Sequence, residues 1–204
     1  MQLIGRYLSP FVRRTAVTLG LYDMPFEHLP LQHTGDDVPA LRRLNPVGRV
    51  PALVVSDDEV IVDSAVIIDY LDHKVGAARS LTPLEGPDRT AVMSLTAVAT
   101  GAVEKAIATA YEVRFRPEER RHAPWVERCT EQAQGGFAHL ESQLDGDWLF
   151  GDRMTQADVT TAVCWQFAGI ATPKLKAGVE APRLDALVER MMSLPVYADT
   201  LPQV

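Results

Sequence analysis

The residues with the clearest capacity for chemistry are Ser9 and Pro10, which follow a short apolar run and precede a helical pattern. Serine at the N-cap and proline at the first helical position are common helix-start residues, so Ser9 could serve as a cap alone. The same geometry also forms an anion site, because free amides and the positive end of the helix dipole face outward. Since a hydroxyl carries one donor and two acceptor sites, Ser9 can cap the helix and still donate to a bound thiolate. That bond would lower the pKa of a bound thiol from about 8.5 toward neutrality.

Two further segments each allow a structural and a chemical interpretation. Val50-Pro51 is either a trans proline that opens a strand or a cis bond that turns the Val50 backbone groups toward a ligand. Asp63-Ser64 is typical of a helix start with Ser64 as the cap. Alternatively, Ser64 and the helix amides hold a carboxylate while Asp63 holds an ammonium, which would suit the zwitterionic end of an amino acid or small peptide.

The elements that must position these residues alternate between strand and helix in the first third of the chain. We expect helices at 10–22, 39–44 and 64–75, and strands at 2–7, 26–31, 52–55 and 60–62. The last two strands form a hairpin with a four-residue loop. The order β-α-β-α-β-β-α indicates an α/β domain.

The rest of the chain has only helical patterns after a segment rich in Gly and Pro. Thr155 and Asp158 predict a capping box, and Gly135-Gly136 indicates close packing or a kink. We interpret Trp165 as a core residue. Helices are expected at 89–115, from Pro117 onward, at 155–170 and at 182–193, with Tyr197 and Leu201 packing a short tail. The predicted division is therefore an α/β domain at 1–78, a linker at 79–88 and an all-helical domain at 89–204.

Composition narrows the classes of protein. The 204 residues are 47% hydrophobic and 23% charged, as in ordinary globular proteins. The net charge is −7, whereas a protein that binds nucleic acid usually carries a positively charged surface, so we expect no nucleic-acid partner. No apolar run approaches the roughly 18 residues of a membrane span, and we expect no secretory signal. The unpaired Cys129 and Cys164 fit a reducing cytoplasm. The five histidines form no metal-binding pattern, so we expect no metal.

Four motifs in series resemble the cytosolic glutathione S-transferases, in particular bacterial members with a Ser-Pro-Phe active-site turn. They are SPFVRR at 9–14, NPVGRVPAL at 45–53, DSAVIIDYL at 63–71 and GDRMTQADVTTA at 151–162. The resemblance covers nearly the whole chain. It implies a thioredoxin-like α/β domain followed by an all-α domain, and glutathione as the cosubstrate.

The resemblance also implies roles for individual residues. Ser9 would hydrogen-bond the glutathione sulfur, and Val50, followed by a cis Pro51, would pair its backbone with the cysteinyl part. Asp63 and Ser64 would hold the γ-glutamyl end. Further contacts to glutathione would come from Phe11 and Arg49.

The second substrate would be an electrophilic small molecule bound between the domains, near Tyr7, Tyr111, Arg114 and Phe115. Tyr7 is also an alternative to Ser9 as the catalytic hydroxyl. Asp63 departs from the family pattern, in which Glu or Gln is commoner at this position.

Three functions are compatible with these residues. The first is a cytoplasmic, homodimeric glutathione transferase without nucleic-acid or membrane partners. The second is a binding or regulatory protein on the same fold with weak or no turnover. Thr100 favours this alternative, because many members place an acid there. The third is thiol–disulfide exchange, which is weaker because position 9 lacks a sulfur.

Overall fold

The structure is a computed structural model that describes residues 1–202, and the chain divides into two compact units. The first unit comprises residues 1–86 together with the segment from Met192 onward, and the second comprises Pro87–Met191. The segment after Met192 therefore belongs with the first unit, although the sequence-based division placed it in the helical domain.

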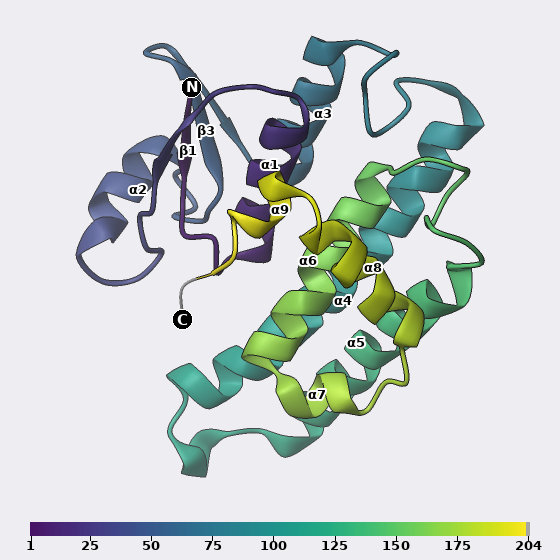
Figure 1. The fold of residues 1–204 in the computed structure, drawn as a ribbon. Helices are drawn as coiled ribbons and strands as arrows, with labels where there is room; N and C mark the ends of the chain where they lie inside the picture. Colours follow the sequence, from purple (N-terminus) through teal and green to yellow (C-terminus); the bar gives the residue numbers. More distant parts are fainter. Residues whose placement is uncertain (203–204) are drawn as a thin grey trace. The chain divides into compact units, whose positions relative to one another are not determined.

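A four-stranded mixed sheet forms the centre of the first unit (Figure 1). The strands lie in the order β2-β1-β3-β4, with β1 parallel to β2 and antiparallel to β3, and β3 antiparallel to β4. Helix α2 covers one face, and α1 and α3 lie side by side on the other. This is a thioredoxin-like arrangement. The strands are β1 (Gln2–Ile4), β2 (Glu27–Leu29), β3 (Ala52–Ser56) and β4 (Glu59–Val62); the helices are α1 (Pro10–Leu21), α2 (Val38–Leu44), α3 (Ser64–Val75) and α9 (Pro195–Ala198), with a 3-10 turn at Gly35–Asp37.

The two faces of this sheet are set by alternation along β1. Ile4 packs with Leu41 of α2 and Ala52 of β3 in one buried cluster. Leu3 is also fully buried, and since successive strand residues point to opposite faces, it lies on the side of α1 and α3. Both faces are therefore apolar, as a sheet covered by helices on both sides requires.

The hairpin differs from the expected one. Ser56 pairs with Glu59, so only Asp57 and Asp58 form the turn, and the four-residue loop is wrong. Aspartate tolerates turn conformations well, and an irregularity between Val54 and Ser56 adjusts the register.

Helices alone make up the described part of the second unit. The expected start at Pro117 is wrong, because Glu118–Arg120 forms a 3-10 turn and α5 begins at Ala123. Helix α4 begins three residues before the expected Arg89, and the short α7 was not predicted. The helices are α4 (Gly86–Phe115), α5 (Ala123–Gln143), α6 (Gln156–Ala171), α7 (Pro173–Ala177) and α8 (Pro182–Met192).

Close packing explains one of the two adjacent glycines in α5. A Cβ on Gly136 would lie 2.8 Å from the Cβ of Ala102 on α4, whereas Gly135 faces open space. Trp165 of α6 is buried and meets Phe137 edge-on at 5.0 Å, which confirms it as a core residue.

The C-terminal segment is held against α1 by a buried arginine. Arg13 lies over the Tyr197 ring at 4.2 Å and donates to the Tyr197 carbonyl and the Thr200 hydroxyl, both at 3.3 Å. Tyr197 is fully buried as expected, but Leu201 is 38% exposed, so its predicted packing is wrong.

Helix α4 is unusually apolar for its exposure. By length and composition alone it could cross a bilayer, with a mean hydropathy of 1.3 over 18 residues, and only 28% of that window is buried. A core helix of a soluble protein passes the same test, so this is weak evidence for a membrane. Its exposed apolar residues include Met93.

Candidate active site

The start of α1 leaves the Ser9 hydroxyl only weakly engaged. Ser9 is the N-cap with an extended backbone, Pro10 follows at the first helical position, and the Ser9 Oγ accepts from the Val12 amide at 3.5 Å. That distance is long for a hydrogen bond. Among residues 1–202 the hydroxyl hydrogen of Ser9 has no acceptor. The group can therefore donate to a ligand without leaving its cap position.

A glycine brings a second backbone segment against this helix start. Gly5 directly follows β1 with φ of 121°, and a Cβ there would lie 2.6 Å from Val12 Cγ2 and 2.7 Å from the Val50 Cβ. Only glycine permits that approach. The Val50–Pro51 bond is cis, and the Val50 N–H and C=O have no hydrogen-bond partner within residues 1–202. These two groups are free to pair with a peptide backbone.

The start of α3 carries an acid and a hydroxyl in adjacent positions. Asp63, rather than the predicted Ser64, is the N-cap: its Oδ1 accepts from the Ala65 amide at 2.8 Å, and its φ is 69°. The Asp63 side chain is exposed, so its second carboxylate oxygen can receive an ammonium.

Ser64 is buried and linked to α1. Its Oγ accepts from Nε and Nη2 of Arg14 at 3.1 and 2.7 Å. Arg14 lies five residues after Ser9, about 7.5 Å along the helix axis. Arg14 therefore links the start of α3 to the first turns of α1.

Two other predicted contact residues lie in the same unit. Phe11 is half-buried in the first turn of α1, and Arg49 is exposed before the cis bond. The Arg49 carbonyl accepts from Asn45 Nδ2 at 2.9 Å, and Asn45 Oδ1 accepts from the Val47 amide at 3.0 Å. The sequence analysis did not identify Asn45 as the residue whose side chain holds this loop. Its position directly after a helix could have indicated the role, because asparagine there favours such turns.

Tyr7 is stacked on a histidine. Its ring lies parallel to that of His28 at 3.9 Å, and His28 Nε2 donates to the Gly5 carbonyl at 2.7 Å. Burial raises the pKa of the Tyr7 phenol above its ordinary value, so Tyr7 stays neutral at physiological pH.

The residues predicted for the second substrate occur in different units. Tyr111 and Phe115 are exposed on the last turns of α4 and meet edge-on at 5.0 Å, and the Arg114 guanidinium lies 5.6 Å from the Phe115 ring centre. Tyr7 belongs to the first unit. That these four residues share one site stays a prediction.

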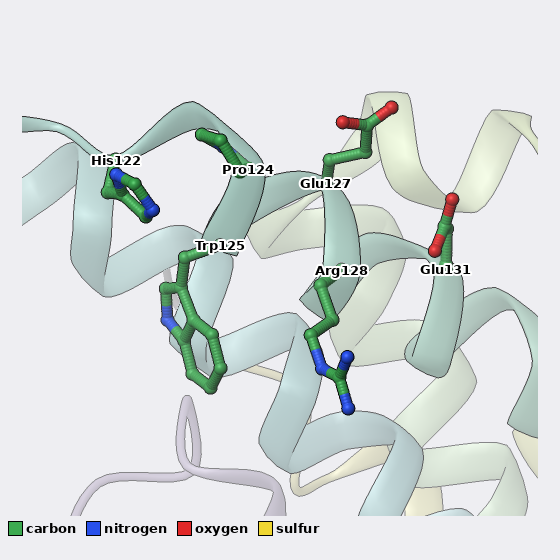
Figure 2. Close-up of a pocket in the computed structure, with 6 residues that line it drawn as sticks. All are labelled: His122, Pro124, Trp125, Glu127, Arg128 and Glu131. Carbon is green, nitrogen blue, oxygen red and sulfur yellow. The ribbon is translucent and has the colours of Figure 1, made fainter.

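A hollow at the beginning of α5 contains none of the predicted residues (Figure 2). Glu127 and Glu131 point away from Trp125 and Arg128, so the polar groups do not converge on one ligand. Its lining residues are His122, Pro124, Trp125, Glu127, Arg128 and Glu131. Within the described chain, no three His, Cys, Asp or Glu side chains are grouped to hold a metal ion.

Comparison with known families agrees with this combination of a thioredoxin-like unit and a helical unit. Residues 3–79 match the glutathione S-transferase N-terminal domain, and residues 123–190 match the glutathione S-transferase C-terminal domain. The chain belongs to the glutathione S-transferase family.

Individual relatives extend the likeness over the full chain. The uncharacterized GST-like protein YibF of Escherichia coli K12 is 27% identical over 203 residues, 99% of this chain and 98% of the relative. Maleylacetoacetate isomerase of Pseudomonas aeruginosa is 32% identical over 167 residues, 78% of this chain and 77% of the relative. A glutathione S-transferase of Methylobacterium radiotolerans, solved with glutathione sulfonate, has a TM-score of 0.91 at 26% identity, covering 100% of this chain and 95% of that one.

Proposed function

We propose that this protein is a cytoplasmic glutathione transferase that activates the glutathione thiolate through the Ser9 hydroxyl for attack on an electrophilic small molecule. The proposal rests on one observation: the Ser9 hydroxyl at the N-terminus of α1 has no acceptor for its hydrogen among residues 1–202. Solved relatives that bind glutathione or its sulfonate support the choice of ligand.

Each part of glutathione has a matching group in the first unit. The sulfur accepts from Ser9, the cysteinyl backbone pairs with the N–H and C=O of Val50, and the γ-glutamyl end meets Asp63 and Ser64. Phe11 and Arg49 add contacts along the tripeptide. Main-chain pairing gives affinity, and the charged ends fix the direction in which the peptide binds.

The chemical step requires the thiol to lose its proton to solvent water before attack. The Ser9 hydroxyl and the positive end of α1 both stabilise the thiolate over the thiol, which lowers the thiol pKa. A hydrogen bond to a charged group contributes about 1.5–3 kcal/mol. The thiolate then forms a bond to the electrophilic carbon while the leaving group departs with its electron pair. Serine itself forms no covalent bond, because no general base accompanies it.

The proposed contacts to the electrophile are Tyr111, Arg114 and Phe115 on α4, and Tyr7 is a neutral phenol of the first unit. The maleylacetoacetate isomerase relative makes maleylacetoacetate a candidate electrophile to test. We also propose a homodimer, whose interface would cover exposed apolar residues such as Val66 of α3 or Met93 of α4. Light scattering after size-exclusion chromatography tests the dimer.

The function is tested by titrating the protein with glutathione and following thiolate absorbance in the ultraviolet against pH. We expect binding at millimolar glutathione or below and a bound thiol that ionises below its free pKa. Conjugation of a chlorodinitrobenzene electrophile should follow the same pH curve. A bound thiol that stays protonated near neutral pH would refute the serine mechanism. Binding without turnover of any electrophile would favour the regulatory alternative, for which the Thr100 hydroxyl, bonded back to the Thr96 carbonyl at 3.1 Å, is the supporting observation.

A further inference from the structure

The unexplained feature of this site is the buried pair formed by Arg14 and Ser64. Arg14 is 3% exposed and Ser64 is 2% exposed, and two guanidinium N–H groups of Arg14 donate to the single Ser64 Oγ. Moving a guanidinium out of water costs free energy, so arginine is rarely buried unless hydrogen bonds or charge interactions offset that cost.

The hydrogen bonds from Arg14 determine which way the Ser64 O–H bond points. A guanidinium has only donors, so the Ser64 oxygen acts as the acceptor toward Arg14 and its hydrogen must point elsewhere. Among residues 1–202 that hydrogen has no acceptor. Ser64 is the first residue of α3, where the Ser64 and Val66 amides also lack backbone partners in the described chain. One hydroxyl and two amides are therefore available to an anion.

The charge of Arg14 strengthens this donor set. A cation that donates to a hydroxyl oxygen polarises the O–H bond, so the hydroxyl becomes a better donor to the next acceptor. The positive charge also adds to the positive end of α3. Both effects favour a carboxylate over a neutral group at this position.

We propose that Arg14 is a positioning residue for the γ-glutamyl carboxylate of glutathione: it directs the Ser64 hydroxyl toward that carboxylate and supplies the charge behind it. This inference rests on the proposed function. Arg14 does not touch the ligand in this arrangement, and it acts through Ser64. Because Arg14 and Ser9 share α1, the same helix sets the spacing between the sulfur and the carboxylate.

The test compares two ligands that differ only at this carboxylate. Glutathione and γ-aminobutyryl-cysteinylglycine, which lacks the α-carboxylate, are titrated by calorimetry into the full-length protein. The wild type should bind glutathione about 10- to 100-fold more tightly than the analogue. Arg14→Met should reduce this ratio to less than about threefold by weakening glutathione alone. Ser64→Ala should do the same, and the double variant should show no further loss.

Arg13→Met is the matched control, because Arg13 is the neighbouring residue on α1 and is equally buried, but it binds the C-terminal segment. It should lower the melting temperature and leave the ratio unchanged. If Arg14→Met does not fold, Arg14→Lys keeps the charge and one donor and should give an intermediate ratio.

The outcomes separate this inference from the function on which it rests. Equal binding of both ligands by the wild type would overturn the inference and leave glutathione binding intact. An equal loss of affinity for both ligands in Arg14→Met would do the same. So would a reduced ratio of the two affinities in Arg13→Met. A wild type that binds neither ligand would refute the proposed function itself.

Discussion

Two helices in this protein, α1 and α6, begin with a hydroxyl residue at the N-cap, but the two hydroxyls have different hydrogen-bond partners. At the start of α1, the Ser9 oxygen accepts one long bond of 3.5 Å from Val12, and its hydrogen has no acceptor in the described chain. At the start of α6, the Thr155 hydroxyl donates to Asp158 at 2.8 Å, and the same carboxylate oxygen accepts from the Thr155 amide at 2.7 Å. The first cap is incomplete, and the second is closed within the protein.

The difference teaches how a structural cap can be told from a binding group. Asp158 also accepts from the Leu149 amide at 2.7 Å and is fully buried, so the α6 start ties the preceding loop to the helix. Nothing there remains for a ligand. A serine cap that still has a free donor, beside a backbone segment with free polar groups, fits a binding site.

Asp158→Ala should have the largest effect in this comparison. The substitution leaves three buried donors without an acceptor, and each such loss costs about 1–3 kcal/mol. We expect the free energy of unfolding in urea to fall by about 3–5 kcal/mol, with unchanged glutathione affinity in the folded protein. Asp152→Ala, an exposed acid in the same loop, is the control and should change it by less than about 0.5 kcal/mol. A loss below 1 kcal/mol for Asp158→Ala would contradict the closed cap.

Ser9→Ala should show the reverse pattern. We expect kcat/KM with a chlorodinitrobenzene electrophile to fall about 10- to 100-fold, because the thiolate loses its donor. The free energy of unfolding should fall by at most about 1 kcal/mol, because the 3.5 Å bond contributes little. Ser9→Thr retains a hydroxyl and should keep most of the rate, whereas Ser9→Asp should keep the cap but repel the thiolate. Full rates in both Ser9→Ala and Ser9→Asp would rule out the serine mechanism.

The sequence predicted both helix starts but could not distinguish their roles. The α3 bounds agree with the expected ones, and those of α1 and α6 agree to within one residue, because caps and apolar periodicity mark them locally. The start of α5 failed because Pro117 and Glu118-Glu119 have the composition of a helix start but form a 3-10 turn. Local composition does not report that choice.

The two adjacent arginines show why part of the site was not predictable. Arg13 and Arg14 are identical in type and nearly equal in burial. Arg13 points to the C-terminal segment and Arg14 to Ser64, 184 and 50 residues away in sequence. Only the three-dimensional packing of α1 against α3 and α9 separates them, whereas Ser9, Val50, Asp63 and Ser64 could be named from local motifs.

The contribution of the Asp158 cap of α6 to the free energy of unfolding should also depend on pH, whereas that of the Ser9 cap of α1 should not. Burial raises the pKa of Asp158 above its ordinary value despite the hydrogen bonds that lower it. A raised pKa in the folded state means that the folded protein binds the proton more tightly, so stability increases as pH falls from the folded pKa toward the unfolded value of about 4. The difference in unfolding free energy between wild type and Asp158→Ala should therefore widen as pH falls from 7 to about 4, measured by urea titration. The corresponding difference for Ser9→Ala should stay constant, and a narrowing difference for Asp158→Ala would show that hydrogen bonding outweighs burial.

The smallest expected change, and the sharpest separation of cap from donor, comes from Ser9→Gly. Glycine is a tolerated N-cap that costs only a few tenths of a kcal/mol relative to serine, but it has no hydroxyl. The free energy of unfolding should therefore stay within about 0.5 kcal/mol of wild type while kcat/KM falls as far as in Ser9→Ala. If the rate instead recovers in Ser9→Gly, the helix start itself activates the thiol, through its amides and dipole, and the hydroxyl is only a cap. If kcat/KM stays low in Ser9→Gly while the helix start is intact, the activity depends on the Ser9 hydroxyl as a hydrogen-bond donor. The start of α6 has no such donor, because its Thr155 hydroxyl is already bonded to Asp158.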